Sequence, residues 1–279
     1  MRLKFLTPAK FIFSVMAGAA LLSPAAMAHD FWLQPNAFQP QTPRPLAVQI
    51  MIGHPEDRTQ WNLNPHRVIS FRSFSAAGVT DQQTALSDTL PSGAVRLDAL
   101  GKGTHILTIE TTSAVSELSH EKFNAYLKEE GLTPISDDRT QRGITDTPGR
   151  EIYSRRGKAL IQVGDYSRDA DAFVTSPLGL TLEIIPRSNP YGLEAGAPMD
   201  AGVHYRGAPT AGVTVGLIRL DNDDGLVAVQ KTDAQGNVSF PRPAAGSWML
   251  HAVWSDPLEN DARADYDTIF SSLSFGFGK

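Results

Sequence analysis

Short runs of alternating apolar and polar residues recur along the first half of the chain, which is typical of β-strands with one buried face. The clearest runs are residues 46–52, 68–74, 95–97, 105–110 and the second half of 151–163. Residues 31–33 also favour a strand, and Pro35 places it at a sheet edge. The pattern therefore predicts a β-rich N-terminal region.

The second half contains six shorter runs at regular spacing, separated by turns rich in Gly, Asp and Pro. The expected strands are residues 199–205, 213–219, 227–231, 238–240, 248–254 and 268–275. The acidic turn at 221–225 lacks the twelve-position spacing of a helix-loop-helix calcium site, so we interpret it as a solvated hairpin. The spacing predicts a small antiparallel β-sandwich of immunoglobulin or transthyretin type.

One segment has a helical period. Phe123, Tyr126 and Leu127 share a face, Ser119 is a suitable N-cap, and Gly131 follows the last turn. We expect a helix near residues 119–130, followed by a polar loop over 136–150. The predicted fold is mainly β, with two β-sandwich-like domains: residues 29–185, which carry the inserted helix, and residues 186–279.

The first 28 residues have the pattern of a signal peptide. Arg2, Lys4 and Lys10 precede an apolar stretch over residues 11–22, and Ala26-Met27-Ala28 is a small-x-small cleavage site. An uncleaved membrane anchor is the alternative, but the apolar stretch is short for a bilayer. We therefore expect export to the periplasm, cleavage after Ala28, and no membrane insertion of the mature chain.

Composition narrows the chemistry. Removing residues 1–28 takes away three basic and no acidic side chains, which moves the formal net charge from −5 to −8. An acidic protein is a poor partner for nucleic acid, since nucleic-acid binding needs a basic surface. The sequence contains no cysteine, so a metal site would use nitrogen and oxygen ligands. The three methionines that remain are far apart in sequence, which disfavours a copper(I) site.

Three histidines are candidate metal ligands. After cleavage, His29 offers its α-amine and its imidazole from one residue. His54 lies where a strand gives way to a turn, and His105 shares a strand face with Leu107 and Ile109, which also suits a satisfied core histidine. No His-x-x-x-His spacing occurs, so a site for nickel, cobalt, copper or zinc must be assembled across strands. The other histidines lack local partners: His66, His120, His204 and His251.

Several stretches together resemble a known family. They are residues 29–35, 53–54, 122–132, 155–164, 177–186 and 232–236. The chain resembles an exported bacterial family of unknown function that is often labelled a periplasmic nickel/cobalt uptake component. The resemblance implies a periplasmic β-rich protein that works near an outer-membrane receptor or a membrane metal transporter.

Three functions from different classes follow. The first is a periplasmic metal-binding protein that serves nickel/cobalt or other divalent-metal uptake. The second is a non-enzymatic envelope scaffold, a receptor-associated β module in which His29 is incidental. The third is a copper oxidase that uses the N-terminal histidine. Nucleophilic catalysis has no support, because no Gly-x-Ser-x-Gly elbow is present.

Overall fold

The computed structural model describes residues 30–54, 57–61, 64–87, 93–194, 196–222 and 225–278. The predicted signal peptide and His29 lie outside the described residues. Strands dominate and are organised in several sheets with a sandwich-like arrangement, which confirms the predicted fold class. No helix in these ranges is long and apolar enough to cross a membrane.

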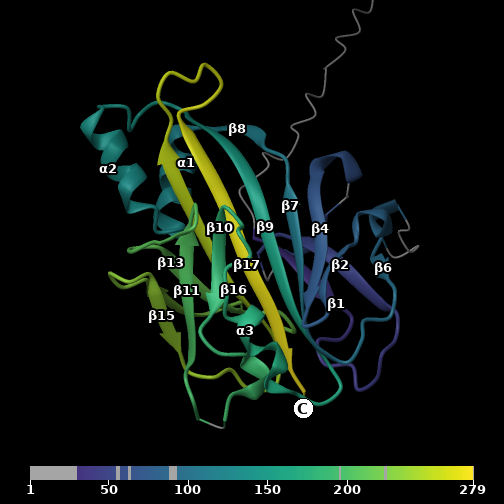
Figure 1. Ribbon diagram of the computed structural model, residues 1–279. Helices are drawn as coiled ribbons and strands as arrows, with labels where there is room; N and C mark the ends of the chain where they lie inside the picture. The colour runs from purple at the N-terminus through teal and green to yellow at the C-terminus, as the bar shows by residue number, and fades with distance from the viewer. Residues whose placement is uncertain are drawn as a thin grey trace, which may run out of the picture.

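A nine-stranded sheet, called here the large sheet, runs through the centre of the molecule (Figure 1). Its order is β14 (Leu226–Lys231), β13 (Thr214–Arg219), β16 (Gly246–Pro257), β17 (Tyr266–Phe277), β9 (Gly149–Val163), β7 (Gly103–Thr111), β4 (Val68–Ser75) and β5 (Gly78–Asp81), with β8 (Ala114–Leu118) also paired to β9. Neighbouring strands are antiparallel except for β17 and β9, which are parallel. That parallel pair lies side by side at the centre of Figure 1. It joins strands from the two predicted regions in one sheet, while the division after residue 185 stays a prediction.

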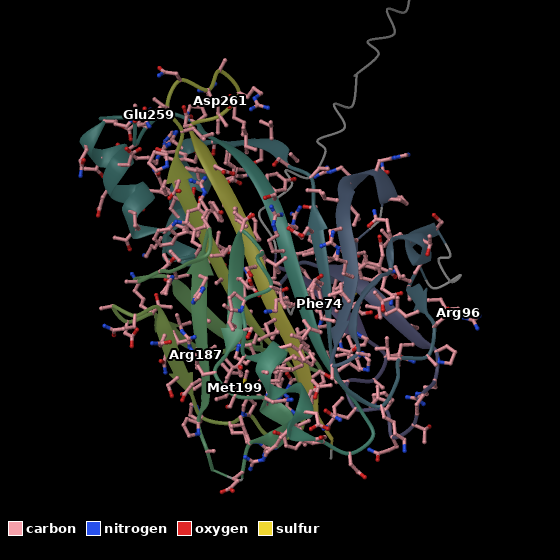
Figure 2. The ribbon with its side chains drawn as sticks, in the orientation of Figure 1. Phe74, Arg96, Arg187, Met199, Glu259 and Asp261 are labelled. Carbon is pink, nitrogen blue, oxygen red and sulfur yellow. The ribbon has the colours of Figure 1, made fainter. Side chains whose placement is uncertain are left out.

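Two smaller sheets cover the two faces of the large sheet. The N-terminal sheet contains β1 (Phe31–Pro35), β2 (Leu46–Ile52), β3 (Thr59–Gln60) and β6 (Val95–Leu97). The C-terminal sheet contains β10 (Leu182–Pro186), β11 (Met199–Tyr205), β12 (Ala208–Pro209) and β15 (Asn237–Phe240). In Figure 2, Arg96 marks the first of these sheets, and Arg187 and Met199 mark the second on the other side of the molecule.

Alternation along the central strands explains this layering. Consecutive side chains of a strand point to opposite faces. Ala159 of β9 packs into a core with Phe31 and Val48 of the N-terminal sheet, and the next residue, Leu160, packs into a second core with Ile184 of the C-terminal sheet. Each face of β9 is therefore buried, as its continuous run of buried positions requires.

Two helices, α1 (His120–Glu129) and α2 (Thr133–Gln141), lie together at one end of the large sheet, and the short α3 (Asp171–Val174) lies at the other end (Figure 1). The position of α1 agrees with the predicted helix, and Phe123 and Tyr126 pack with Tyr266 and Phe270 of β17. The segment after residue 136 was expected to be a loop, but α2 occupies its first part. Only Ile135 and Arg139 of α2 are buried, so this helix lacks the apolar period that sequence patterns detect.

A buried ion pair fastens the C-terminal sheet to the large sheet. Nζ of Lys158 lies 2.9 Å from Oε1 of Glu183, and at most 1% of either side chain is exposed. The Glu183 carboxylate also accepts hydrogen bonds from the backbone N–H groups of Leu178, Gly179 and Leu180. Because a buried charge is costly without partners, this network specifies how the two sheets meet.

Candidate functional site

A small pocket opens on the face of the large sheet where β13, β14 and β16 lie next to the end of α1. It encloses about 170 Å³. Its polar side chains are carboxylates and imidazoles, and its remaining wall is largely apolar. The lining residues are Asp30, His54, Glu129, Glu130, Thr214, Gly216, Ile218, Leu226, Val229 and His251. Four separate chain segments therefore contribute titratable groups to one cavity.

His251 lines this pocket from the large sheet. It lies in β16 opposite Gly216 of β13, where the missing side chain makes room for the side chain of Leu226. Its Nδ1 atom is 3.1 Å from Oδ1 of Asp30, and both side chains are more than nine-tenths buried. Its Nε2 atom is also buried and has no hydrogen-bond partner in the described part of the chain.

The protonation of His251 follows from this setting. Burial lowers the pKa of His251, the neighbouring Asp30 carboxylate opposes that effect, and the imidazole of His54 adds to it. A lowered pKa keeps the ring neutral near pH 7, with one protonated and one free nitrogen. Because the Asp30 carboxylate faces Nδ1, the proton belongs there, and Nε2 keeps its lone pair.

Glu130 brings an unusual carboxyl group to the same pocket. It caps the C-terminal end of α1, and its Oε2 atom is 3.9 Å from Nδ1 of His251. Burial raises the pKa of Glu130 well above its ordinary value, and the charges of Asp30, Glu129 and Glu151 raise it further. The C-terminal end of a helix also disfavours negative charge. A cation bound in the pocket would stabilise the ionised form of this group.

The end of α1 is held against β13 by a glycine. Gly131 has φ of 66°, and a Cβ atom at this position would collide with the side chain of Thr214. The backbone N–H of Leu132 donates to the carbonyl of Leu127 at 2.8 Å, which closes the helix end in the manner of a left-handed C-cap. Glu130 is thereby fixed one residue before the contact with Thr214.

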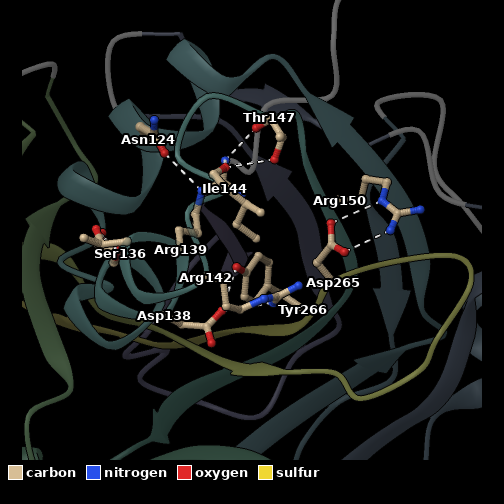
Figure 3. Close-up of polar contacts among 11 residues, drawn as sticks. Asn124, Ser136, Asp138, Arg139, Arg142, Ile144, Thr147, Arg150, Asp265 and Tyr266 are labelled. Carbon is tan, nitrogen blue, oxygen red and sulfur yellow. Dashed lines mark hydrogen bonds and ion pairs between the residues drawn. The ribbon is translucent and has the colours of Figure 1, made fainter.

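Arg139 of α2 braces α1 from the other side (Figure 3). Its Nη2 atom donates to the carbonyls of Ile144 and Thr147 at 2.8 and 2.6 Å, and its Nε atom donates to Oδ1 of Asn124 in α1 at 3.2 Å. The same view shows the hydroxyl of Tyr266, which donates to Asp138 at 3.0 Å. The Arg139 bonds join α2 to α1 and to the following loop, and the Tyr266 bond joins α2 to β17 of the large sheet.

His54 reaches the pocket from the turn after β2. Gly53 has φ of 116°, a conformation that favours glycine, and the backbone N–H of His54 donates to Oδ1 of Asp57 at 2.8 Å. The backbone N–H of Gly53 in turn donates to the carbonyl of Asp30 at 3.1 Å. This bond ties the start of the described chain to the turn that carries His54.

A family profile described as "Domain of unknown function (DUF4198)" matches residues 26–256. The chain belongs to the DUF4198 family. This membership confirms the domain-of-unknown-function part of the resemblance seen in the sequence. No curated protein sequence matches this DUF4198 chain.

Solved structures offer only distant similarity to this DUF4198 protein. The D0-D1 domain of intimin is 10% identical, with a TM-score of 0.20 over 89% of this chain and 98% of the chain of that D0-D1 structure. Three N-terminal domains of the bacteriophage RB49 outer capsid protein Hoc are 7% identical, with a TM-score of 0.18 over 88% and 59%. The fibronectin(III)-like modules of Clostridium thermocellum CbhA are 7% identical, with a TM-score of 0.18 over 86% and 93%.

The three predicted histidine ligands of the DUF4198 chain have different positions. His54 lines the pocket, while His29 lies outside the described residues and directly precedes Asp30 in the sequence. His105 lines another cavity, beside β4 and β5, and its Nε2 atom is 2.8 Å from the carbonyl oxygen of Gly101. Burial lowers the pKa of His105, as expected for a core histidine. The structure therefore does not bring His105 into the pocket of His54.

Four titratable pocket residues were not among the predicted ligands: Asp30, Glu129, Glu130 and His251. Glu129 and Glu130 carried a signal in the sequence, because two acidic residues at a helix C-terminal end oppose the helix dipole. His251 stands alone in an apolar strand, a pattern that fits a core residue equally well. Within the described residues, no three His, Asp or Glu side chains converge tightly enough to hold a metal ion by themselves.

Proposed function

We propose that this protein binds a divalent transition-metal ion, such as nickel, cobalt, copper(II) or zinc, in the pocket of His54, Glu130 and His251. The observation that carries the proposal is the His251 ring. Nδ1 faces a carboxylate, and Nε2 is buried with no hydrogen-bond partner among the residues that the structure describes. Metal-binding histidines characteristically have this arrangement, in which a carboxylate orients the ring and the free nitrogen binds the ion.

The ligand types suit these metals. Neutral imidazole nitrogens and carboxylate oxygens bind nickel, copper and zinc. Nε2 of His251 is the first ligand in the proposal, His54 is the second, and Asp30 acts by orienting His251. Glu130 supplies a carboxylate whose ionisation the metal would favour, because a nearby positive charge lowers a carboxyl pKa.

His29 completes the proposed set of ligands. The described residues alone hold no converged cluster of three ligands, so the proposal needs a donor from elsewhere in the chain. If the signal peptide is removed after Ala28, the α-amine and imidazole of His29 are both available. The backbones of Asp30 and Gly53 are joined by a hydrogen bond. In the sequence, His29 directly precedes Asp30 and His54 directly follows Gly53.

The biological role that we propose is an accessory in divalent-metal uptake in the periplasm. It is supported by the signal-peptide pattern, the acidic mature chain, and the resemblance to a family labelled with nickel/cobalt uptake. In this role the protein captures the ion and passes it to a membrane transporter or an outer-membrane receptor.

Calorimetric titration tests the proposal. The chain beginning at His29 is titrated with Ni²⁺, Co²⁺, Cu²⁺ and Zn²⁺, and His251→Ala is compared with His105→Ala as the matched control. We expect His251→Ala to lower the affinity at least tenfold, and Asp30→Asn to lower it about 10- to 100-fold through misorientation of the ring. Equal affinities for the wild type and His251→Ala would show that the pocket is not the site.

A second chain form isolates the contribution of His29. A two-residue Gly-Ser extension before His29 converts its α-amine into an amide, which is a poor metal ligand. The extended chain should bind more weakly while its folding is unchanged by circular dichroism. Identical binding by both forms would remove the α-amine from the ligand set.

A further inference from the structure

One edge of the large sheet exposes an apolar strand. The strand is β14, which ends the strand order and pairs only with β13 among the described strands. Leu226, Val227 and Val229 are 57%, 54% and 51% exposed. Proteins usually protect such edges with charges, prolines or covering loops, because an edge strand presents unpaired backbone groups to other chains.

Two cavities lie beside this edge strand. On one side, Leu226 and Val229 form a lip of the pocket that contains His251. On the other side lies an open polar cavity of about 810 Å³ between β14 and β15. There the side-chain amide of Gln230 exchanges hydrogen bonds with the backbone of Ser239, so β14 and β15 are joined by a side chain and not by strand pairing.

We propose that β14 is a docking edge to which an extended, basic segment of another protein adds as a further strand. Strand addition explains the exposed apolar residues, since the side chains on one face of an added strand would pack on Leu226 and Val229, which both line the pocket, while Val227 is the extra residue of a β-bulge opposite Leu217 and Ile218. The added backbone would satisfy the free edge of β14.

Charge decides the chemistry of the segment. The exposed carboxylate of Glu129 lies at the pocket under the lip, while Asp30 is buried against His251 and burial raises the pKa of Glu130, which favours its neutral form. Lys231 lies at the far end of β14, where its ammonium donates to Thr133 at 3.3 Å. Lysine or arginine side chains on the added strand would therefore meet complementary charge near Leu226 and Val229.

The same charges disfavour a second copy of this chain as the occupant. Pairing β14 with β14 of another copy would bring together two chains that each carry an exposed Glu129 beside this edge and a formal net charge of −5. Like charges placed opposite each other across an interface cost free energy. A basic partner segment relieves this repulsion instead.

Fluorescence anisotropy tests the docking edge with two labelled synthetic octapeptides, one alternating Val and Lys and the other alternating Val and Glu. We expect the Val-Lys peptide to bind at least tenfold more tightly. Two further versions of it are N-methylated on alternate residues, one on the odd and one on the even positions. Because only every second N–H of an added strand points to its neighbour, one version should lose binding and the other should keep it.

Variants locate the site. Val227→Lys adds a like charge to the edge without touching the pocket lining and should weaken binding of the Val-Lys peptide at least fivefold. Val79→Lys is the control, since Val79 is 60% exposed on β5, at the opposite edge of the same sheet. Equal binding of both peptides, equal effects of both N-methylation patterns, or a dimer that Val227→Lys disrupts in light scattering would overturn the proposal.

The docking edge and the metal proposal can fail separately. Peptide binding is measured without metal on both wild type and His251→Ala, and both should bind the Val-Lys peptide. If metal binding is unchanged in His251→Ala while both proteins prefer the Val-Lys peptide, the metal proposal fails and the docking edge stands. If His251→Ala loses metal binding while neither protein prefers the Val-Lys peptide, the docking edge fails and the metal proposal stands.

Discussion

Replacing Glu130 by glutamine is expected to stabilise the metal-free protein and to weaken metal binding at the same time. Only 11% of the Glu130 side chain is exposed. Burial raises the pKa of its carboxyl group well above the ordinary value, and the charges of Asp30, Glu129 and Glu151 raise it further. In the folded protein the protonated form is therefore favoured. Ionising it near neutral pH costs folding free energy that glutamine, of nearly the same shape, does not require.

The sign follows from linkage. A carboxyl group whose folded pKa is raised contributes stability below its unfolded pKa, and that stability is lost as the pH rises through the folded pKa. Each tenfold change in proton affinity is worth about 1.4 kcal/mol, so we expect Glu130→Gln to raise the free energy of unfolding by about 1–2 kcal/mol at pH 8. At pH 4 the wild-type carboxyl is protonated in the folded protein, and the difference should largely disappear.

Urea denaturation at pH 4, 6 and 8, with chelator present, measures this effect. Glu129→Gln is the matched control, because Glu129 is the exposed neighbour on the same helix and should change stability by less than about 0.5 kcal/mol. Metal titration of the same Glu130→Gln protein should show weaker binding. A variant that is less stable than wild type at pH 8, or equally altered at pH 4 and pH 8, would refute the assignment of Glu130 as a destabilised carboxyl group.

Two further substitutions test the framework of the site. Gly131→Ala and Gly143→Ala both put a side chain at a positive φ, but only at position 131 would the new side chain collide with another group, the side chain of Thr214. Urea denaturation should therefore show a loss of folding free energy that is about 1–3 kcal/mol larger for Gly131→Ala than for Gly143→Ala. Equal losses would show that α1 is not held by this contact. Lys158→Met leaves the buried Glu183 carboxylate without its cation and should cost about 3–5 kcal/mol in the same assay. A loss below 1 kcal/mol would mean that the backbone N–H groups alone satisfy Glu183.

The positions of most strands follow from the local sequence pattern and could be predicted. Alternation located β2, β6 and β11 to the residue and β4, β7, β13, β16 and β17 to within a few residues, because one buried face imposes a period of two. Of β9, only the second half was expected, although the strand begins at Gly149. The parallel pairing of β17 with β9 joins residues more than a hundred positions apart, and no local pattern specifies it. For the same reason α2 was missed, since its stability comes from Arg139 and its carbonyl partners and not from an apolar stripe.

The candidate site divides in the same way. His54 could be predicted because a polar residue at a strand end faces a turn, where binding groups gather. His251 could not, because an isolated histidine in the middle of a buried strand has the same local sequence whether it is satisfied or free. Only the contact with Asp30, over two hundred residues earlier in the chain, distinguishes the two cases.

Histidine side-chain NMR measures the central proposal most directly. The chain beginning at His29, labelled with ¹⁵N in its imidazole rings, is titrated with Zn²⁺, and the seven histidines are assigned by single substitutions. We expect the Nε2 resonance of His251 to shift as a metal-bound nitrogen, with a change at His54, while His105, bonded to Gly101, keeps its shift. A saturating amount of Zn²⁺ that leaves the His251 Nε2 resonance unchanged would contradict the metal site.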